Sequence, residues 1–186
     1  MTFDDQDYLR RIPLLDRVLI GSDDLTRRIQ ELGAEITRDY ADSGSMPLLV
    51  CILKGAYVFL ADLTRFIGVE HEVDFMAVSS YEGGTQSTGV VKIEKDLRAN
   101  ITGRDVIIVE DIVDSGLTLN HLLELLGTRG PRSIRICALL DKSAARKKDV
   151  EVHYRGFEIP KEFVVGYGLD YDEKYRNLPF IGVLKT

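Results

Sequence analysis

The sequence predicts an α/β fold: a central parallel, twisted sheet flanked by helices, with a small hood formed by the N- and C-terminal segments. Three near-continuous apolar runs, at residues 48–53, 105–109 and 133–140, indicate strands that are buried on both faces. Segments with helical spacing separate these runs. Strands that alternate with helices are typical of a parallel sheet, whose ligands bind at the carboxyl ends of the strands.

The first helix is expected to begin at Ser22. Serine is a good N-cap residue, because its side-chain oxygen can accept a hydrogen bond from a free backbone N–H of the first turn. Asp23 and Asp24 follow, and carboxylates near a helix N-terminus are favourable. Apolar residues then recur at helical spacing and predict one buried stripe: Leu25, Ile29, Leu32 and Ile36.

Strands and helices alternate from Pro47 onward. Glycines and a proline after residue 126 are typical of a helix end. The expected elements, in order, are a strand at 48–53, a helix at 56–66, a strand at 73–80, a strand at 105–109, a helix at about 118–126 and a strand at 133–140.

The tail of the chain departs from this alternation. Residues from Phe163 onward carry several aromatic side chains and the acidic run at 170–173. We therefore expect a single domain over residues 1–186, with a core of about 40–150 and a hood built from about 1–20 and 151–186.

Composition excludes several classes of protein. The 186 residues carry a formal net charge of −6, which argues against general nucleic-acid binding. An acidic N-terminus and the lack of a long apolar run favour a cytoplasmic protein with no membrane contact. Cys51 and Cys137 lie in apolar runs and are expected to be small buried residues rather than a disulfide pair.

One stretch carries the chemistry. An apolar strand ends in carboxylates and a turn that enters a helix: Glu110, Asp111, Asp114, Ser115, Gly116 and Thr118. Adjacent Glu110 and Asp111 can hold ribose hydroxyls or a hard cation such as magnesium. Gly116 allows close approach of the backbone, and the hydroxyls and helix N-terminus offer donors to a phosphate. Asp114, between the two, is a candidate general base.

Other ligand-binding motifs do not fit. The chain has no G-x-x-x-x-G-K-[ST] sequence, which excludes a P-loop. Gly166 and Gly168 begin a dinucleotide fingerprint, but Tyr171 takes the place of its third glycine. The histidines lack metal-type spacing: His71, His121 and His153. The segment 79–89, rich in glycine and small polar residues, fits either a floppy connection or a mobile lid.

The run from Val106 to Leu119 resembles the signature of the type I phosphoribosyltransferases, and the chain is most similar to the hypoxanthine-guanine branch of bacterial length. The likeness covers nearly the whole chain. Further matching segments are the pyrophosphate loop at 53–56, the start of the mobile loop at Ser80 and Tyr81, the lysine segment at 139–142, the hood strand at 163–171, and Arg176. The lysine and hood segments mark the 6-oxopurine branch.

The resemblance implies how the base would be bound. Asp114 would be the acid/base partner of purine N7, and Lys142 would read the 6-oxygen. Phe163 would stack on the base, while main-chain groups of Val164 would bond its N1 and C2 edge. Lys142 and Phe163 argue against adenine and pyrimidines as substrates.

The resemblance also implies a phosphate and metal site. Glu110 and Asp111 would bind ribose and Mg²⁺, and Asp170 would hold a second Mg²⁺ directly or through water. The cradle of the 5′-phosphate would consist of Asp114, Ser115, Gly116, Leu117 and Thr118, with Leu117 acting only through its backbone.

The pyrophosphate would face Lys54, Gly55 and Arg176, with a strained peptide bond between Lys54 and Gly55. Ser80 and Tyr81 would open the loop that covers the reacting sugar.

The family thus implies a magnesium-dependent enzyme of purine salvage. It would transfer 5-phosphoribosyl from phosphoribosyl pyrophosphate to hypoxanthine and guanine, giving IMP, GMP and pyrophosphate, and relatives are usually homo-oligomers, so a dimer or tetramer is expected. Two alternatives stay open: a sister enzyme for xanthine, and a nucleotide-sensing regulator on the same fold. The regulator would usually add a nucleic-acid-binding module and a basic face, for which this acidic chain has no spare segment.

Overall fold

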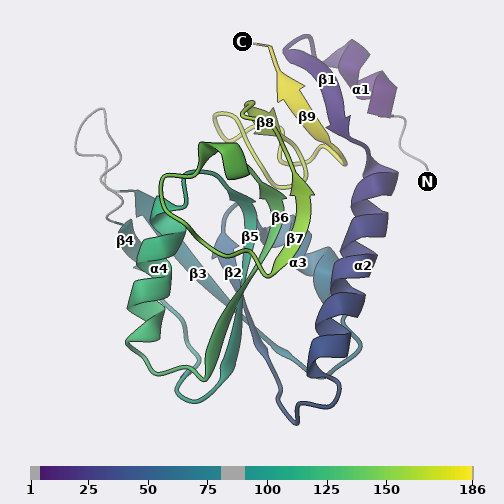
Figure 1. Ribbon diagram of the computed structural model, residues 1–186. Helices are drawn as coiled ribbons and strands as arrows, with labels where there is room; N and C mark the ends of the chain where they lie inside the picture. The colour runs from purple at the N-terminus through teal and green to yellow at the C-terminus, as the bar shows by residue number, and fades with distance from the viewer. Residues whose placement is uncertain (1–4, 81–90, 186) are drawn as a thin grey trace.

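The computed structural model describes residues 5–80 and 91–185, which form two sheets (Figure 1). The large sheet has the strand order β4-β3-β2-β5-β6-β7, and the small sheet has the order β1-β9-β8. The strands of the large sheet are β2 (Leu48–Leu53), β3 (Glu72–Ser80), β4 (Val91–Lys95), β5 (Asp105–Val113), β6 (Ser133–Asp141) and β7 (Tyr154–Glu158).

Five strands of the large sheet run parallel, as the apolar runs predict, and the edge strand β4 runs antiparallel to β3. Strand β4 is the next strand after β3, and the ten residues between them are fewer than the dozen or so that a parallel crossover connection needs. From the central pair β2 and β5 the chain proceeds to β3 on one side and to β6 on the other. The carboxyl ends of β2 and β5 therefore flank a topological switch point, where ligands bind in open α/β sheets.

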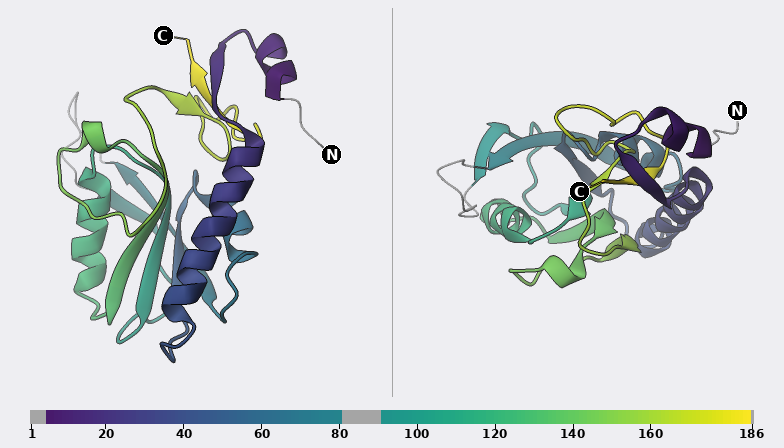
Figure 2. Two further views of the ribbon diagram at one scale, coloured as in Figure 1. Left: turned by 45° about the vertical axis from the view of Figure 1, so that its right-hand side comes forward. Right: turned by 90° about the horizontal axis from the view of Figure 1, so that it is seen from above.

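Helices cover both faces of the large sheet (Figure 2). They are α2 (Ser22–Tyr40) and α3 (Tyr57–Thr64) on one face and α4 (Leu117–Gly127) on the other. Successive strand residues point to opposite faces. In β5, Ile107 and Val109 pack with α2 and α3, whereas Val106 and Ile108 pack with α4. This double burial explains why the central strands lack polar alternation.

The N-terminus of α2 differs from the prediction. The N-cap residue is Gly21, and Ser22 is the first helical residue. A carboxylate from helix α1 (Asp5–Arg11) supplies the cap instead: Asp5 accepts a bond from Ser22 N at 3.1 Å and one from Ser22 Oγ at 3.3 Å. The capping group comes from 17 residues upstream, so the local sequence does not reveal it.

The small sheet joins the two ends of the chain above the large sheet (Figure 1). Strand β9 (Ile181–Leu184) pairs antiparallel with both β1 (Leu15–Ile20) and β8 (Val164–Val165). These strands enclose a separate apolar cluster around Phe180. Strand β7 pairs with β6 in the large sheet, although its residues fall in the range expected for the hood. None of the helices in the described part of the chain is long and apolar enough to cross a membrane.

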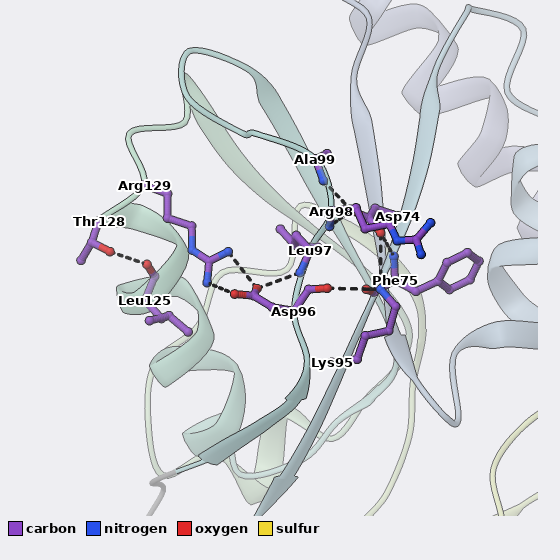
Figure 3. A network of polar contacts seen from close by, with 10 residues as sticks. All are labelled: Asp74, Phe75, Lys95, Asp96, Leu97, Arg98, Ala99, Leu125, Thr128 and Arg129. Atoms are coloured by element: carbon purple, nitrogen blue, oxygen red, sulfur yellow. Dashed lines mark hydrogen bonds and ion pairs between the residues drawn. The ribbon is translucent and has the colours of Figure 1, made fainter.

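A polar network fastens the segment after β4 to its neighbours (Figure 3). Buried Asp74 in β3 accepts backbone N–H bonds from Phe75, Arg98 and Ala99 at 2.7–2.9 Å. Burial alone would raise the pKa of Asp74, but these bonds and Lys95 hold it below its ordinary value. These polar bonds add to the apolar packing of Leu97 and Ala99 against the core.

Candidate active site

Strand β5 extends beyond the predicted end at residue 109 and carries both adjacent acids. Its parallel ladder with β6 includes the pair Glu110–Ala138 and ends at Val113–Asp141. A ladder consists of backbone hydrogen bonds, so carboxylate side chains do not interrupt it. Glu110 and Asp111 are therefore held by a strand rather than by a loop.

The surroundings of these two acids favour their uncharged forms. Burial, together with the charge of Asp111, raises the pKa of Glu110 well above its ordinary value. Burial raises the pKa of Asp111 to about 6, although the Ile112 N–H donates to its Oδ1 at 2.8 Å and Arg176 also favours the charged form. A cation placed beside the pair would stabilise the charged forms.

The donor set suits magnesium, which prefers oxygen ligands and keeps water and substrate phosphates in its coordination shell. In residues 5–80 and 91–185, no group of three or more His, Cys, Asp or Glu side chains could hold a metal ion by itself. Two adjacent carboxylates could supply part of the oxygen ligands of a magnesium ion, with substrate and water as the others.

Three segments meet at Gly55. A Cβ atom on Gly55 would lie 1.5 Å from Asp111 Oδ2, so only glycine fits here. A Cβ atom on Gly168 would lie 2.1 Å from the Gly55 carbonyl oxygen, and Gly168 has a φ of +102°. The Gly55 backbone thus lies against the Asp111 side chain at the end of β5 and against the backbone of the hood at Gly168. The non-proline cis peptide bond joins Leu53 and Lys54, one bond before the strained bond expected between Lys54 and Gly55.

A small cavity of about 130 Å³ lies at the turn between β5 and α4. Gly116 is the N-cap of α4 with a φ of +76° and has no side chain to cap the helix, while Ser115 Oγ accepts a long hydrogen bond of 3.4 Å from the Leu117 N–H. The N–H groups that follow in this first turn are available to an anion. The cavity is lined by Glu110, Ile112, Val113, Asp114, Ser115, Gly116, Thr118 and Leu119. Leu117 opens α4 and does not line this cavity, and the role of its backbone in phosphate binding stays a prediction.

A second cavity, of about 270 Å³, lies between the end of β5 and the hood. It brings together six predicted site residues and two others: Asp111, Asp114, Lys142, Phe163, Val164 and Asp170, with Ile112 and Leu169. Ile112 and Asp114 line both cavities, so the two are contiguous. The Phe163 ring is half exposed and forms a T-shaped contact with Tyr171, with 5.7 Å between the ring centroids, so half of its surface is open to an aromatic ligand.

The cations expected to face pyrophosphate are paired with acids of the hood. Lys54 Nζ lies 3.0 Å from Glu173 Oε1. Arg176 Nη2 lies 2.9 Å from Asp170 Oδ1 and 3.2 Å from Glu173 Oε2. Hydrogen bonds from Lys54 and Arg176 lower the pKa of Glu173, so it is charged at neutral pH. Glu173 therefore bridges the two cations.

Sequence reasoning missed Glu173, Ile112 and Leu169. Glu173 lies in the acidic run that the sequence singles out, but nothing local indicates that it reaches Lys54, 119 residues away. Ile112 lies between Asp111 and Asp114 in the signature run, and this position could have identified it as a residue that lines the site. Tyr81 lies outside the described residues, as does most of the expected lid, and Ser80 is the last residue of β3.

Comparison with known proteins identifies relatives along almost the whole chain. The family model described as "Phosphoribosyl transferase domain" matches residues 21–172. A hypoxanthine-guanine phosphoribosyltransferase of Bacillus subtilis is 53% identical over 171 residues, which cover 92% of this chain and 94% of that protein. A hypoxanthine phosphoribosyltransferase of Salmonella typhimurium is 54% identical over 165 residues, covering 89% and 93%.

Solved structures show the same likeness. A hypoxanthine phosphoribosyltransferase of Staphylococcus aureus superposes with a TM-score of 0.89 at 50% identity, covering 93% of each chain. One from Trypanosoma cruzi also gives a TM-score of 0.89, at 40% identity, covering 94% of this chain and 93% of the other. The six-stranded sheet, its two helical layers and the hood thus recur in these structures.

Proposed function

The chain belongs to the phosphoribosyltransferase family, and on that premise we propose that it transfers 5-phosphoribosyl from phosphoribosyl pyrophosphate to hypoxanthine and guanine. The products are IMP or GMP and pyrophosphate, which is a reaction of purine salvage. The named relatives support the choice of base, since they are hypoxanthine or hypoxanthine-guanine phosphoribosyltransferases. No comparison supports the xanthine or regulator alternative.

The observation that carries the proposal is the pair of Lys142 and Asp114 in the larger cavity, with Nζ and Oδ2 3.2 Å apart. In a 6-oxopurine, O6 and N7 are neighbouring atoms on one edge. An ammonium group only donates hydrogen bonds, so Lys142 suits O6. A carboxylate accepts, so Asp114 suits an N7 that carries a proton. The half-exposed ring of Phe163 offers a stacking surface, and Val164 lines the same cavity.

The proposed reaction is a displacement at C1 of the ribose. The purine N9 lone pair forms the new bond to C1 as the bond from C1 to the pyrophosphate oxygen breaks. Asp114 takes the proton from N7, which leaves a neutral base in the nucleotide. Lys54 and Arg176 stabilise the charge that develops on the leaving pyrophosphate. The turn from Ser115 to Thr118 holds the 5′-phosphate.

We propose that Glu110, Asp111 and Asp170 serve the magnesium site, together with the ribose and pyrophosphate oxygens. Magnesium supplies positive charge that screens the pyrophosphate from the carboxylates and stabilises the leaving group. The buried, poorly neutralised pair at Glu110 and Asp111 supports this assignment. Without a cation, two carboxylates would face a polyanion.

We also propose a homo-oligomer, a dimer or tetramer, located in the cytoplasm, and a single domain over residues 1–186. Sedimentation at several protein concentrations tests the assembly: a monomer at every concentration would contradict it.

One assay tests the function. The purified protein is incubated with phosphoribosyl pyrophosphate, Mg²⁺ and each of hypoxanthine, guanine, xanthine, adenine and orotate, and the nucleotide formed is measured. We expect turnover with hypoxanthine and guanine, and its loss when EDTA replaces Mg²⁺. Turnover with xanthine alone, or full activity in metal-free buffer, would overturn the corresponding part of the proposal.

A further inference from the structure

The segment that follows β6 forms the back wall of the phosphate turn. The Lys142 N–H donates to the Val113 carbonyl at 2.9 Å, and the N–H groups of Lys147 and Lys148 donate to the Ser115 carbonyl at 2.9 and 3.2 Å. A Cβ atom on Gly116 would lie 2.7 Å from the Lys148 carbonyl oxygen. The turn and this segment therefore touch without space between them, and the shape of the turn depends on residues 142–148.

Arg146 is the charged side chain of this wall. Its side chain is only 15% exposed, and its Nη2 lies 2.5 Å from Oδ1 of Asp141, which is almost fully buried. Asp141 also receives Arg155, whose Nε lies 2.9 Å from Oδ2. Two guanidinium groups thus share the Asp141 carboxylate, and Arg155 also pairs with Glu158, with 3.6 Å between Nη1 and Oε2.

The second terminal nitrogen of Arg146 faces the phosphate turn. Nη1 lies 3.6 Å from the position that a Cβ atom on Gly116 would take. In the part of the chain that the structure describes, it is one of two buried side-chain nitrogens without a hydrogen-bond partner, the other being Arg104 Nη2. A buried unpaired donor is unfavourable, and such groups occur in native proteins where function requires them.

We propose that Arg146 is a positioning residue for the 5′-phosphate subsite. Asp141 fixes its guanidinium behind the turn at Ser115 and Gly116, so that its charge and free N–H favour a dianion bound in front of the turn. The Arg146 guanidinium is largely buried, so water screens its charge poorly. The charge therefore acts on a bound phosphate across the turn at Ser115 and Gly116. This inference rests on the proposed function, because it assigns the 130 Å³ cavity to the 5′-phosphate.

The competing explanation is that Arg146 only stabilises the fold. A variant of Arg155 distinguishes this explanation from the proposal. Both arginines bind Asp141, but Arg155 is 47% exposed and does not approach Gly116. Replacing Arg155 by Gln removes one partner of Asp141 and the weak pair with Glu158, and it changes no residue of the phosphate turn. Replacing Arg146 by Gln removes the other partner and also the charge behind the turn.

The experiment measures binding of ribose 5-phosphate, which carries the 5′-phosphate but no pyrophosphate, by calorimetry on the full chain. Kd is compared for the wild type, R146Q, R155Q and R146K, and pyrophosphate is titrated into each as a second probe. We expect R146Q to weaken the binding of ribose 5-phosphate by about tenfold or more, since a poorly screened charge interacts strongly with a nearby dianion. R155Q should change the Kd for ribose 5-phosphate by less than about twofold. The affinity for pyrophosphate should be similar in all four proteins.

R146K keeps the charge and should recover most of the lost affinity. In the enzyme assay, R146Q should raise the KM for phosphoribosyl pyrophosphate more than it lowers kcat. Equal weakening by R146Q and R155Q, equal loss for pyrophosphate, or a lysine variant no better than glutamine would each overturn the proposal. Calorimetry does not depend on turnover, so a wild type that binds ribose 5-phosphate but makes no nucleotide would count against the proposed function alone.

Discussion

Lys142 and Asp114 form an ion pair across the larger cavity, with 3.2 Å between Nζ and Oδ2, and they lie 28 positions apart in the chain. The lysine side chain is 10% exposed and the aspartate side chain is 53% exposed. A buried ammonium needs a partner, and Asp114 supplies it while no base is bound. A 6-oxopurine that inserts its O6 and N7 edge would offer each group a new partner, so base recognition and proton transfer are coupled.

Replacement of Asp114 by Asn should lower kcat without unfolding the protein. Asparagine keeps the shape and one acceptor oxygen, but it cannot take the N7 proton. General acid–base catalysis is typically worth about 10²–10⁴-fold, and we expect a loss in that range. Steady-state kinetics with hypoxanthine measure it, and thermal unfolding checks the fold. Asp172→Asn, an exposed acid that lines neither cavity, is the matched control. A kcat close to that of the wild type would refute the role of Asp114.

Replacement of Glu173 by Gln should tighten the binding of phosphoribosyl pyrophosphate. Glu173 holds both Lys54 and Arg176 in the described state, and it competes with the pyrophosphate for them. Exposed ion pairs are weak, so the KM for the donor should fall only about two- to fivefold. The effect should shrink as ionic strength rises. A KM that is unchanged at low salt, or one that rises, would show that Glu173 does not compete with the substrate.

Replacement of Asp111 by Asn should stabilise the protein in metal-free buffer at pH 7.5 while it damages activity. Burial raises the pKa of Asp111 from 3.8 to about 6, so folding favours its protonated form. The stability from this form is fully present below about pH 4 and is lost as pH rises through 6. The asparagine side chain does not ionise, so the variant does not lose stability as pH rises. Its gain in the free energy of unfolding should be on the order of 1–3 kcal/mol above pH 7.

Denaturant unfolding at a series of pH values measures this gain. It should be small near pH 4 and should grow between pH 4 and pH 6. A gain that is equal at all pH values would mean that the asparagine side chain improves packing rather than removing a buried charge.

The sequence predicts the elements that depend on local patterns. The apolar run at 48–53 matches β2 residue for residue, and the run at 105–109 lies within β5. Strands buried on both faces leave a continuous apolar signal, which explains this success. The hood strand β1 was not predicted, because it forms only by pairing with β9, far away in the chain.

The site shows the same division. The signature run supplied Glu110, Asp111 and Asp114, because their spacing is local. Glu173 bridges two cations because the hood lies beside the end of β2, a contact between segments that are distant in the sequence. Arg146 lies near Gly116 because the chain after β6 packs against the phosphate turn, which sequence spacing does not reveal. Residues of this second kind become visible only when distances and burial are known.

Replacement of Lys142 by Ala should reduce the preference for hypoxanthine over adenine. The Lys142 ammonium lies in the cavity and can only donate hydrogen bonds, which suits the 6-oxygen of hypoxanthine or guanine. Adenine presents an amine at that position, so two donors would face each other and a nearly buried cation would lose its partner. Sites built to bond one group reject an analogue that lacks it by roughly 10⁴-fold or more.

We therefore expect Lys142→Ala to lower kcat/KM for hypoxanthine sharply and to narrow the gap to adenine, measured with both bases at saturating phosphoribosyl pyrophosphate. Loss of the ion pair alone would affect both bases equally, because Asp114 would lose its partner in either case. Lys185→Ala is a control for charge, since Lys185 donates to the Pro13 carbonyl and lines neither cavity. Unchanged selectivity in the Lys142 variant would mean that the base is read elsewhere, at the backbone of Val164, which borders the same cavity.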